Sequence, residues 1–168
     1  IRNKVMLRAM TEELIFGAIE NLHRYDLKIN SLNMIGLPTE TEETVRETLA
    51  MNQKGKVHYA DASIFQPYPG VSLTKYAIEN GWVDDNLTHW GGQYSKSVLK
   101  FSDKLKSVFH AYQIVFPLLV EFPWLEKYIG LIRKINDNKI GEKIMDAVYR
   151  FTYGFMMTPR IYPVKMPL

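Results

Sequence analysis

The strongest constraint on the fold is an alternation of helical and strand-like segments over the first half of the chain. Apolar residues at helical spacing predict helices over residues 11–24, 41–54 and 73–80. Apolar runs between these helices predict strands over residues 27–35 and 60–66, and the end of the first strand is mostly apolar on both faces, as in a buried parallel strand. Helices of this length permit right-handed crossovers. The order predicts an α/β fold that supplies part of a parallel sheet or barrel.

Capping residues mark the ends of these segments. Thr39 followed by Glu42 fits a capping box at the start of the second helix, and Ser72 is suited to cap the third. Gly55 and Gly81 stand where the second and third helices are expected to end. The predicted boundaries therefore depend on turn chemistry as well as on periodicity.

The pattern changes in the second half, which divides the chain into a first region, residues 1–83, and a helical region, residues 84–168. Pro117 and Pro123 are expected to separate helices from their neighbours. The predicted elements of the helical region are three helices and an extended, proline-containing end: residues 96–116, 124–136, 140–157 and 158–168.

Positive charge gathers in the second half. Residues 1–95 hold 9 Lys/Arg and 12 Asp/Glu, whereas residues 96–168 hold 12 Lys/Arg and 6 Asp/Glu. A basic, aromatic-rich tail can meet an anionic partner, and the simpler interpretation is a solvated helical surface. No segment resembles a nucleic-acid-binding motif, so nucleic acid is not an expected partner.

The composition excludes several classes of function. The chain has no cysteine, which rules out disulfides, thiolate metal sites and a cysteine nucleophile within these residues. Its four histidines lack metal-ligand spacing, so we expect no metal site. The longest apolar stretch, residues 108–125, is broken by prolines and polar residues, and no signal-peptide pattern is present. We expect a cytoplasmic protein without a transmembrane segment, with peripheral membrane contact as an open alternative.

Three places combine residues that can contact a ligand. Residues 33–41 end a strand in Gly36, which permits close approach at the carboxyl edge of a parallel sheet. Residues 64–70 bracket a tyrosine with two prolines directly after a strand. Arg8 stands among apolar residues and can bind a carboxylate in a bidentate ion pair. Taken singly, each also fits a simpler role: an ordinary turn, a stiff turn with a packed tyrosine, and a surface arginine.

Taken together and in order, these segments resemble radical S-adenosylmethionine (SAM) enzymes, especially the branch with an amino-terminal cobalamin-binding domain. The resemblance covers residues 1–83, roughly half of the chain. The matching segments are Arg2, Val5-Met6-Leu7-Arg8, Asn33-Met34-Ile35-Gly36-Leu37-Pro38 with Glu40-Thr41, Glu47-Thr48-Leu49 with Asn52, and Phe65-Gln66-Pro67-Tyr68-Pro69-Gly70.

The resemblance implies the C-terminal part of a partial (β/α)₆ TIM-like barrel, followed by an α-helical C-terminal region. In such enzymes a CxxxCxxC loop holds a [4Fe–4S] cluster, which cleaves SAM reductively to a 5′-deoxyadenosyl radical. The reaction would be methyl transfer, cyclisation or rearrangement of a metabolite, cofactor or lipid. The cluster, and cobalamin where it is used, would be held by the missing N-terminal half of the same protein, and this fragment alone would be inactive.

The resemblance also implies roles for individual residues. Arg8 would contact the SAM carboxylate, and Ser31 and Asn33 would point toward the SAM ribose or the substrate. The adenine pocket would be flanked or completed by residues at two strand ends: Ile35, Gly36, Phe65 and Gln66. The structural turns would be formed by Pro38, Glu40, Pro69 and Gly70, with Glu40 securing its turn through backbone hydrogen bonds.

Departures from the family pattern leave a second interpretation open. Thr39 stands where the strand–helix turn usually has glycine, and Val71 stands where a threonine or serine is common. The absence of cysteine matters more, because these residues cannot hold the cluster. The alternative is a non-catalytic, degenerate half-barrel that acts as a binding module, with a basic helical tail that contacts a partner or a membrane.

Overall fold

The computed structural model describes residues 10–86, 91–92, 95–136 and 138–161. Its first half alternates helices and strands: α1 (Glu12–Arg24), β1 (Asn30–Ile35), α2 (Glu42–Lys54), β2 (Tyr59–Ile64) and α3 (Ser72–Glu79). Its second half is helical: α4 (Asp103–Glu121), a 3₁₀ segment η1 (Pro123–Tyr128), α5 (Ile129–Asn136), α6 (Lys139–Phe151), a π-helical segment η2 (Thr152–Met157) and α7 (Thr158–Ile161). The fold is therefore mixed α/β, and the predicted order of elements in the first half is confirmed.

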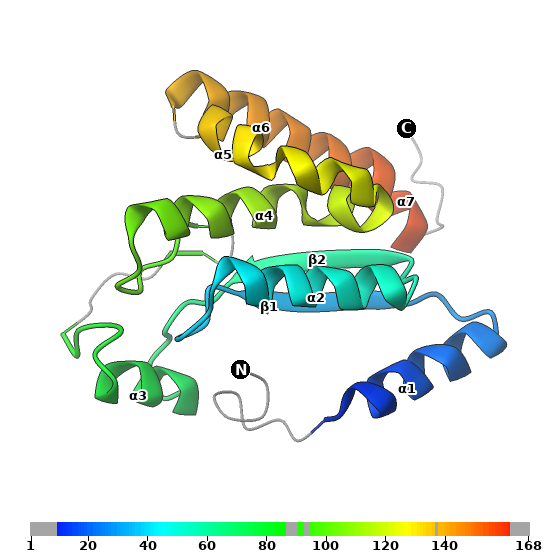
Figure 1. The fold of residues 1–168 in the computed structure, drawn as a ribbon, viewed down its shortest axis with the longest axis horizontal. Coiled ribbons are helices and arrows are strands. Elements are labelled where there is room, and N and C mark those ends of the chain that lie inside the picture. The colour runs from blue at the N-terminus through cyan, green and yellow to red at the C-terminus, as the bar shows by residue number, and fades with distance from the viewer. Residues whose placement is uncertain (1–9, 87–90, 93–94, 137, 162–168) are drawn as a thin grey trace, which may run out of the picture.

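The two strands form a parallel pair in which Asn30 lies opposite Tyr59 and Ile35 lies opposite Ile64. The helix α2 connects them and α4 packs on β2 (Figure 1). One face of the pair is thereby covered, and its core includes Ile35, Ala62 and Ile64, each no more than 2% exposed. Because α4 belongs to the same core as α2, the two halves of the chain share one hydrophobic cluster.

The other face of β1 is open. Leu32 is 79% exposed and Met34 is 41% exposed, whereas Ile35 is fully buried. The end of β1 was expected to be buried on both faces. Side chains alternate across a strand, and the helices α2 and α4 cover only one side, so every second residue remains exposed in the described part of the chain.

The helical half forms two layers above the sheet (Figure 1). The helix α4 packs between the strands and the α5–α6 pair. Pro117 lies inside α4 and does not end it, contrary to expectation. The missing N–H removes one helical hydrogen bond, but Phe116 and Leu119 are fully buried on either side of Pro117, and this packing outweighs the loss.

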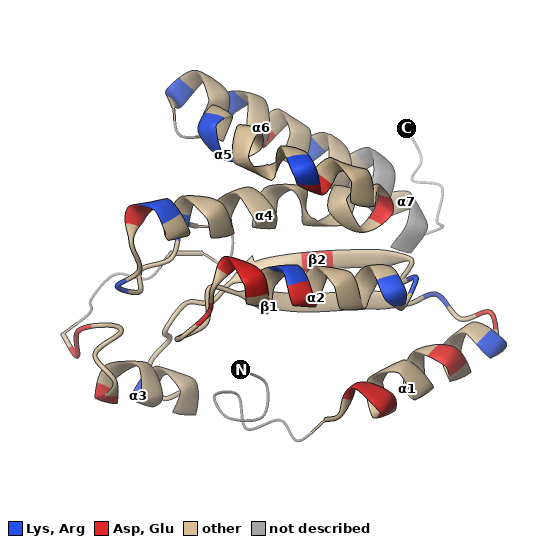
Figure 2. Cartoon of the chain, viewed as in Figure 1, with Lys and Arg blue, Asp and Glu red and all other residues tan. Residues whose placement is uncertain are grey.

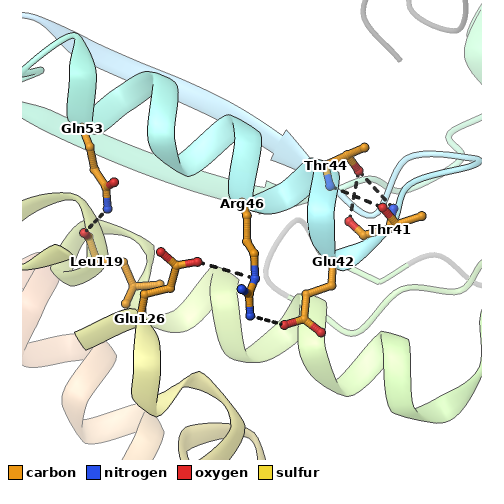
Figure 3. Close-up of polar contacts among 7 residues, drawn as sticks. All are labelled: Thr41, Glu42, Thr44, Arg46, Gln53, Leu119 and Glu126. Carbon is orange, nitrogen blue, oxygen red and sulfur yellow. Dashed lines mark hydrogen bonds and ion pairs between the residues drawn. The ribbon is translucent and has the colours of Figure 1, made fainter. Parts of the chain in front are cut away.

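The helix α2 is also tied to the second half by polar contacts (Figure 3). Gln53 donates from Nε2 to the carbonyl oxygen of Leu119 at 2.8 Å. The guanidinium of Arg46 pairs with Glu42 at 2.9 Å and with Glu126 of η1 at 3.5 Å. Since Arg46 is half exposed, its ion pairs add little to stability, and apolar burial beneath α2 holds these elements together.

Three local predictions need correction. The capping box of α2 joins Thr41 and Thr44, so the predicted pair of Thr39 and Glu42 is wrong by position (Figure 3). The N-cap of α3 is Val71, without a side-chain cap bond, because Ser72 is already the first helical residue. Residues 158–161 form α7 and are not extended, since Pro159 lies in a first helical turn, where its missing N–H is tolerated.

None of the helices in the described ranges is both long enough and apolar enough to cross a membrane.

Candidate functional site at the carboxyl edge of the strands

The two connections that follow the strands lie beside each other because the strands are parallel. The N–H of Phe65 donates to the carbonyl oxygen of Ile35 at 2.8 Å, which continues the ladder beyond β2. Gly36 therefore lies next to the segment that carries Phe65 and Gln66. The structure thus brings together the four residues predicted to surround the adenine: Ile35, Gly36, Phe65 and Gln66. All four are buried.

Gly36 makes the close packing at this edge possible. Its φ is +74°, a backbone conformation that glycine adopts readily. A Cβ atom at this position would lie 3.5 Å from Cγ2 of Ile64 and 3.6 Å from Cδ2 of Phe109, which are ordinary contacts. The backbone conformation, more than lack of space, therefore favours glycine here.

Glu40 holds the turn that begins at Gly36. Its carboxyl oxygen Oε2 accepts from the N–H of Leu37 at 3.0 Å, and the N–H of Glu40 donates to the Leu37 carbonyl oxygen at 3.0 Å. These two hydrogen bonds are of the kind expected if Glu40 secures its turn. Burial raises the pKa of the Glu40 carboxyl to about 7, and the backbone N–H groups of Leu37 and Gly36 oppose that rise.

Gln66 presents a buried amide without a partner. The residue is 5% exposed, and neither its Oε1 nor its Nε2 has a hydrogen-bond partner among the described residues. A Cβ atom at Gly91 would lie 3.4 Å from this Nε2, so the Gly91 backbone lies close beside the amide. Leaving a buried polar group unpaired costs about 1–3 kcal/mol, so the amide is a candidate ligand group.

The turn after Gln66 is rigid and borders a separate hollow. The Tyr68 hydroxyl donates to the carbonyl oxygen of Gly91 at 3.3 Å, and Thr74 donates to the Tyr68 carbonyl oxygen at 2.7 Å. Pro69 and Gly70, with φ of +79° at the glycine, line a hollow of about 570 Å³ between this turn and α3. Pro38 is buried in the neighbouring turn. These positions agree with scaffold roles for the turn residues.

Ser31 and Asn33 lie elsewhere, on the face of β1 that α2 covers. The amide of Asn33 donates to the carbonyl oxygen of Asp61 at 2.9 Å and to Oγ of Ser31 at 3.3 Å. It accepts from Nδ2 of Asn52 in α2 at 2.9 Å. These groups can reach a ligand only if the network rearranges, so their contact with the ribose or substrate stays a prediction. Arg8 lies outside the described residues.

Asp61 of β2 and Tyr153 of η2 form a carboxyl–phenol pair that the sequence does not predict. The Tyr153 hydroxyl of η2 donates to Oδ1 of Asp61, and the ring of Tyr153 makes an edge contact with Tyr59 at 6.3 Å between centroids. Burial is the main cause of a raised Tyr153 pKa, followed by the hydrogen bond to Asp61. The one sequence feature that points to this pair is the single aspartate, Asp61, within the mostly apolar residues 59–65.

The described residues do not form a metal site. No group of three His, Asp or Glu side chains within them is arranged to hold an ion. His23 contacts the Gly55 carbonyl oxygen, His58 accepts from the N–H of Ile29, and His110 contacts Asn136. Since the chain also has no cysteine, an iron–sulfur cluster does not fit these residues.

Comparison with known proteins finds two curated relatives. An uncharacterized methyltransferase of Pyrococcus horikoshii is 33% identical over 73 residues, which are 44% of this chain and 16% of the relative. A tRNA-2-methylthio-N(6)-dimethylallyladenosine synthase of Syntrophotalea carbinolica is 25% identical over 167 residues, which are 97% of this chain and 35% of the relative. The chain thus spans about a third or less of the length of these relatives. No family model and no solved structure matches it.

Proposed function

We propose that this chain is the C-terminal portion of a radical SAM enzyme and forms one wall of its SAM site. The observation that carries the proposal is the unpaired, buried amide of Gln66 beside the Gly36 turn, at the carboxyl edge of parallel strands. That edge is where α/β folds bind ligands. Two relatives with enzyme names, one a methyltransferase and one a tRNA-2-methylthio-N(6)-dimethylallyladenosine synthase, support a methyl-transfer type of chemistry.

The residues present fit the adenine of SAM better than any other part of it. A carboxamide offers one acceptor and two donor hydrogens, which match the alternating donor and acceptor atoms of an adenine edge. The positive φ of Gly36 shapes the turn against which the adenine would lie. Bound there, SAM would supply the adenosyl group of the radical reaction. The cluster requires ligands from outside this chain, so we assign no step through it to these residues.

Several finer features belong to the same proposal. The parent would have a partial (β/α)₆ barrel, completed by an N-terminal part that holds the cluster. Cobalamin and a small-molecule or lipid substrate follow from the branch resemblance described above. In this interpretation the open face of β1, with Leu32 and Met34 exposed, is the side that the rest of the barrel covers.

The test measures SAM binding and cleavage by the full-length protein, reconstituted without oxygen. Gln66→Leu should weaken SAM binding about five- to thirteenfold, because a hydrogen bond of about 1–1.5 kcal/mol is lost. Gln53→Leu is the matched control, since it removes an amide that bonds only within the protein, to Leu119. Formation of 5′-deoxyadenosine, with about four irons per chain, would support the proposal.

A different result would favour the second candidate function. If the full-length protein binds neither iron nor SAM, the chain is a degenerate half-barrel that acts as a binding module. The complete absence of cysteine from these 168 residues favours that candidate. If SAM binds but Gln66→Leu and Gln53→Leu have equal effects, the enzyme assignment survives and the placement of the adenine is wrong.

A further inference from the structure

The α5–α6 hairpin forms the outer layer of the helical half, on the far side of α4 from the sheet (Figure 1). Its buried side is small: α6 buries Gly141 and Met145, and α5 buries Ile129 and Asn136. Four further residues of the hairpin are partly buried against the same core, Ile132, Ile135, Val148 and Tyr149, and most of its remaining described residues are exposed. The exposed residues of the hairpin are therefore available for binding.

An apolar stripe runs along the exposed side of α6. Ile140, Ile144 and Phe151 are 75%, 52% and 57% exposed, and Ala147 between them is also exposed. These four residues, which we call the α6 stripe, recur at intervals of three and four, so they share one side of the helix. Leu131 of the neighbouring α5 is 57% exposed. Large aliphatic side chains so exposed on a regular helix face are unusual for a surface in contact only with water.

Positive charge borders the α6 stripe. With 3.6 residues per turn, Lys139, Lys143 and Arg150 fall within an arc of about 40° directly beside it. Lys139 and Lys143 have no ion-pair partner in the described part of the chain. Figure 2 shows Lys and Arg along both helices of the hairpin.

The acidic residues of the hairpin that the structure describes neutralise Arg150 but leave Lys139 and Lys143 unpaired within that part of the chain. Glu142 pairs at 3.4 Å with Lys96, which lies in the loop before α4, and Asp146 pairs with Arg150 at 2.8 Å. By the same helical geometry Glu142 lies opposite the stripe, whereas Asp146 lies next to Lys139, on its side farther from the stripe. The exposed α6 surface is therefore apolar at its centre and basic at its border.

We propose that the α6 surface lies on a membrane leaflet rich in anionic phospholipid. An amphipathic helix with aliphatic and aromatic residues on one side and lysines beside them lies in the plane of the lipid interface. The α6 stripe would enter the boundary between headgroups and acyl chains, and Lys139 and Lys143 would reach back to the phosphates. The inference does not depend on the SAM site, because none of its residues lies at the carboxyl edge of the strands.

The chemistry of the surface favours lipid over RNA. Phosphate contacts with RNA use Lys and Arg, and base stacking uses aromatic rings. Two exposed isoleucines at the centre of the surface contribute to neither. Lipid binding uses both features, since burial of the stripe and attraction of the lysines add together.

The experiment is co-sedimentation of the full-length protein with vesicles of phosphatidylcholine alone, or of equal parts phosphatidylcholine and phosphatidylglycerol. We expect at least about tenfold stronger partition onto the anionic vesicles. Ile140→Asn with Ile144→Asn should reduce that partition at least tenfold, and Lys139→Glu with Lys143→Glu should do the same. Circular dichroism would verify that each variant is folded.

Matched controls place equal changes away from the hairpin. Leu14→Asn with Leu27→Asn alters two other exposed leucines, and Lys28→Glu with Lys56→Glu produces the same change in net charge. Both controls should bind as the unmodified protein does. The proposal is overturned if no vesicle binding occurs, if neutral and anionic vesicles bind equally, or if the controls lose as much as the hairpin variants. It is also overturned if only the lysine variant loses binding and single-stranded RNA competes, which would identify a polyanion site.

Discussion

The buried carboxyl of Glu40 predicts a stability that falls with rising pH. Its pKa rises from 4.5 to about 7 on folding, chiefly because burial disfavours the ionised form. Between these two values the folded state holds a proton that the unfolded state has released. Raising the pH through this window therefore favours unfolding, and above about pH 7 the effect is complete.

The magnitude follows from the difference between the two pKa values. Each pKa unit corresponds to about 1.4 kcal/mol, so the contribution of Glu40 to the free energy of unfolding should fall by about 3 kcal/mol across the window. No allowance for solvent screening is needed, since Glu40 is 4% exposed. The side chain also holds its turn, because its Oε2 accepts from the N–H of Leu37 at 3.0 Å.

The assay compares urea unfolding of the unmodified protein and of Glu40→Gln between pH 4.5 and pH 8. Glutamine resembles the protonated carboxyl, so the two proteins should differ least near pH 4.5. By pH 8 the free energy of unfolding of the variant should have risen by about 3 kcal/mol relative to that of the unmodified protein. Glu43→Gln, at an exposed position in the first turn of α2, is the control and should show no comparable trend. If the unmodified protein instead becomes more stable relative to Glu40→Gln as pH rises, the N–H groups of Leu37 and Gly36 outweigh burial. That result would refute the reasoning.

Two further predictions concern local structure. Thr39 has φ of +70°, which a β-branched residue adopts at a cost of about 1–2 kcal/mol, so Thr39→Gly should raise the free energy of unfolding. Thr41→Ala should lower the free energy of unfolding by about 1 kcal/mol, because the α2 cap is lost. If Thr39→Gly and Thr41→Ala change this free energy equally, the observed cap is contradicted. Tyr153→Phe should lower the free energy of unfolding by about 1.5–3 kcal/mol, since Asp61 loses a phenol donor. Tyr128→Phe, at an exposed ring, is its control, and a loss no larger than that of Tyr128→Phe would mean that the bond to Asp61 contributes nothing.

Short-range physics explains which features the sequence could predict. The strand–helix–strand order was predictable because apolar spacing distinguishes β1 from α2 within a few residues. The role of Glu40 was predictable because its partner, Leu37, is three residues away. The grouping of Gly36 with Gln66 required only that the two strands be parallel.

Long-range packing decided the features that the sequence could not predict. Asp61 and Tyr153 are separated by 92 positions, and no periodicity links them. Pro117 is normally a helix breaker, and it continues α4 only because its neighbours are buried in a core that α2 and the strands complete. The position of the α2 cap depended on which threonine of two has a positive φ, and that choice follows from the three-dimensional turn.

The alternation of side chains along β1 limits how one ligand can use this sheet. Asn33 and Ser31 share the face that α2 covers, whereas Leu32 and Met34 share the open face. The register places Leu32 opposite Asp61 and Met34 opposite Ser63, so these four residues lie on one side of the pair. A ligand that lies flat on the open face would contact Leu32 and Met34, because the Asp61 carboxyl already accepts from the Tyr153 hydroxyl. A ligand that also contacts Gln66 must lie across the carboxyl edge, and from there it reaches Asn33 only past Ile35. The edge and the open face are therefore the accessible parts of the site, and the Ser31–Asn33 network serves either as support for β1 or as a contact made after rearrangement.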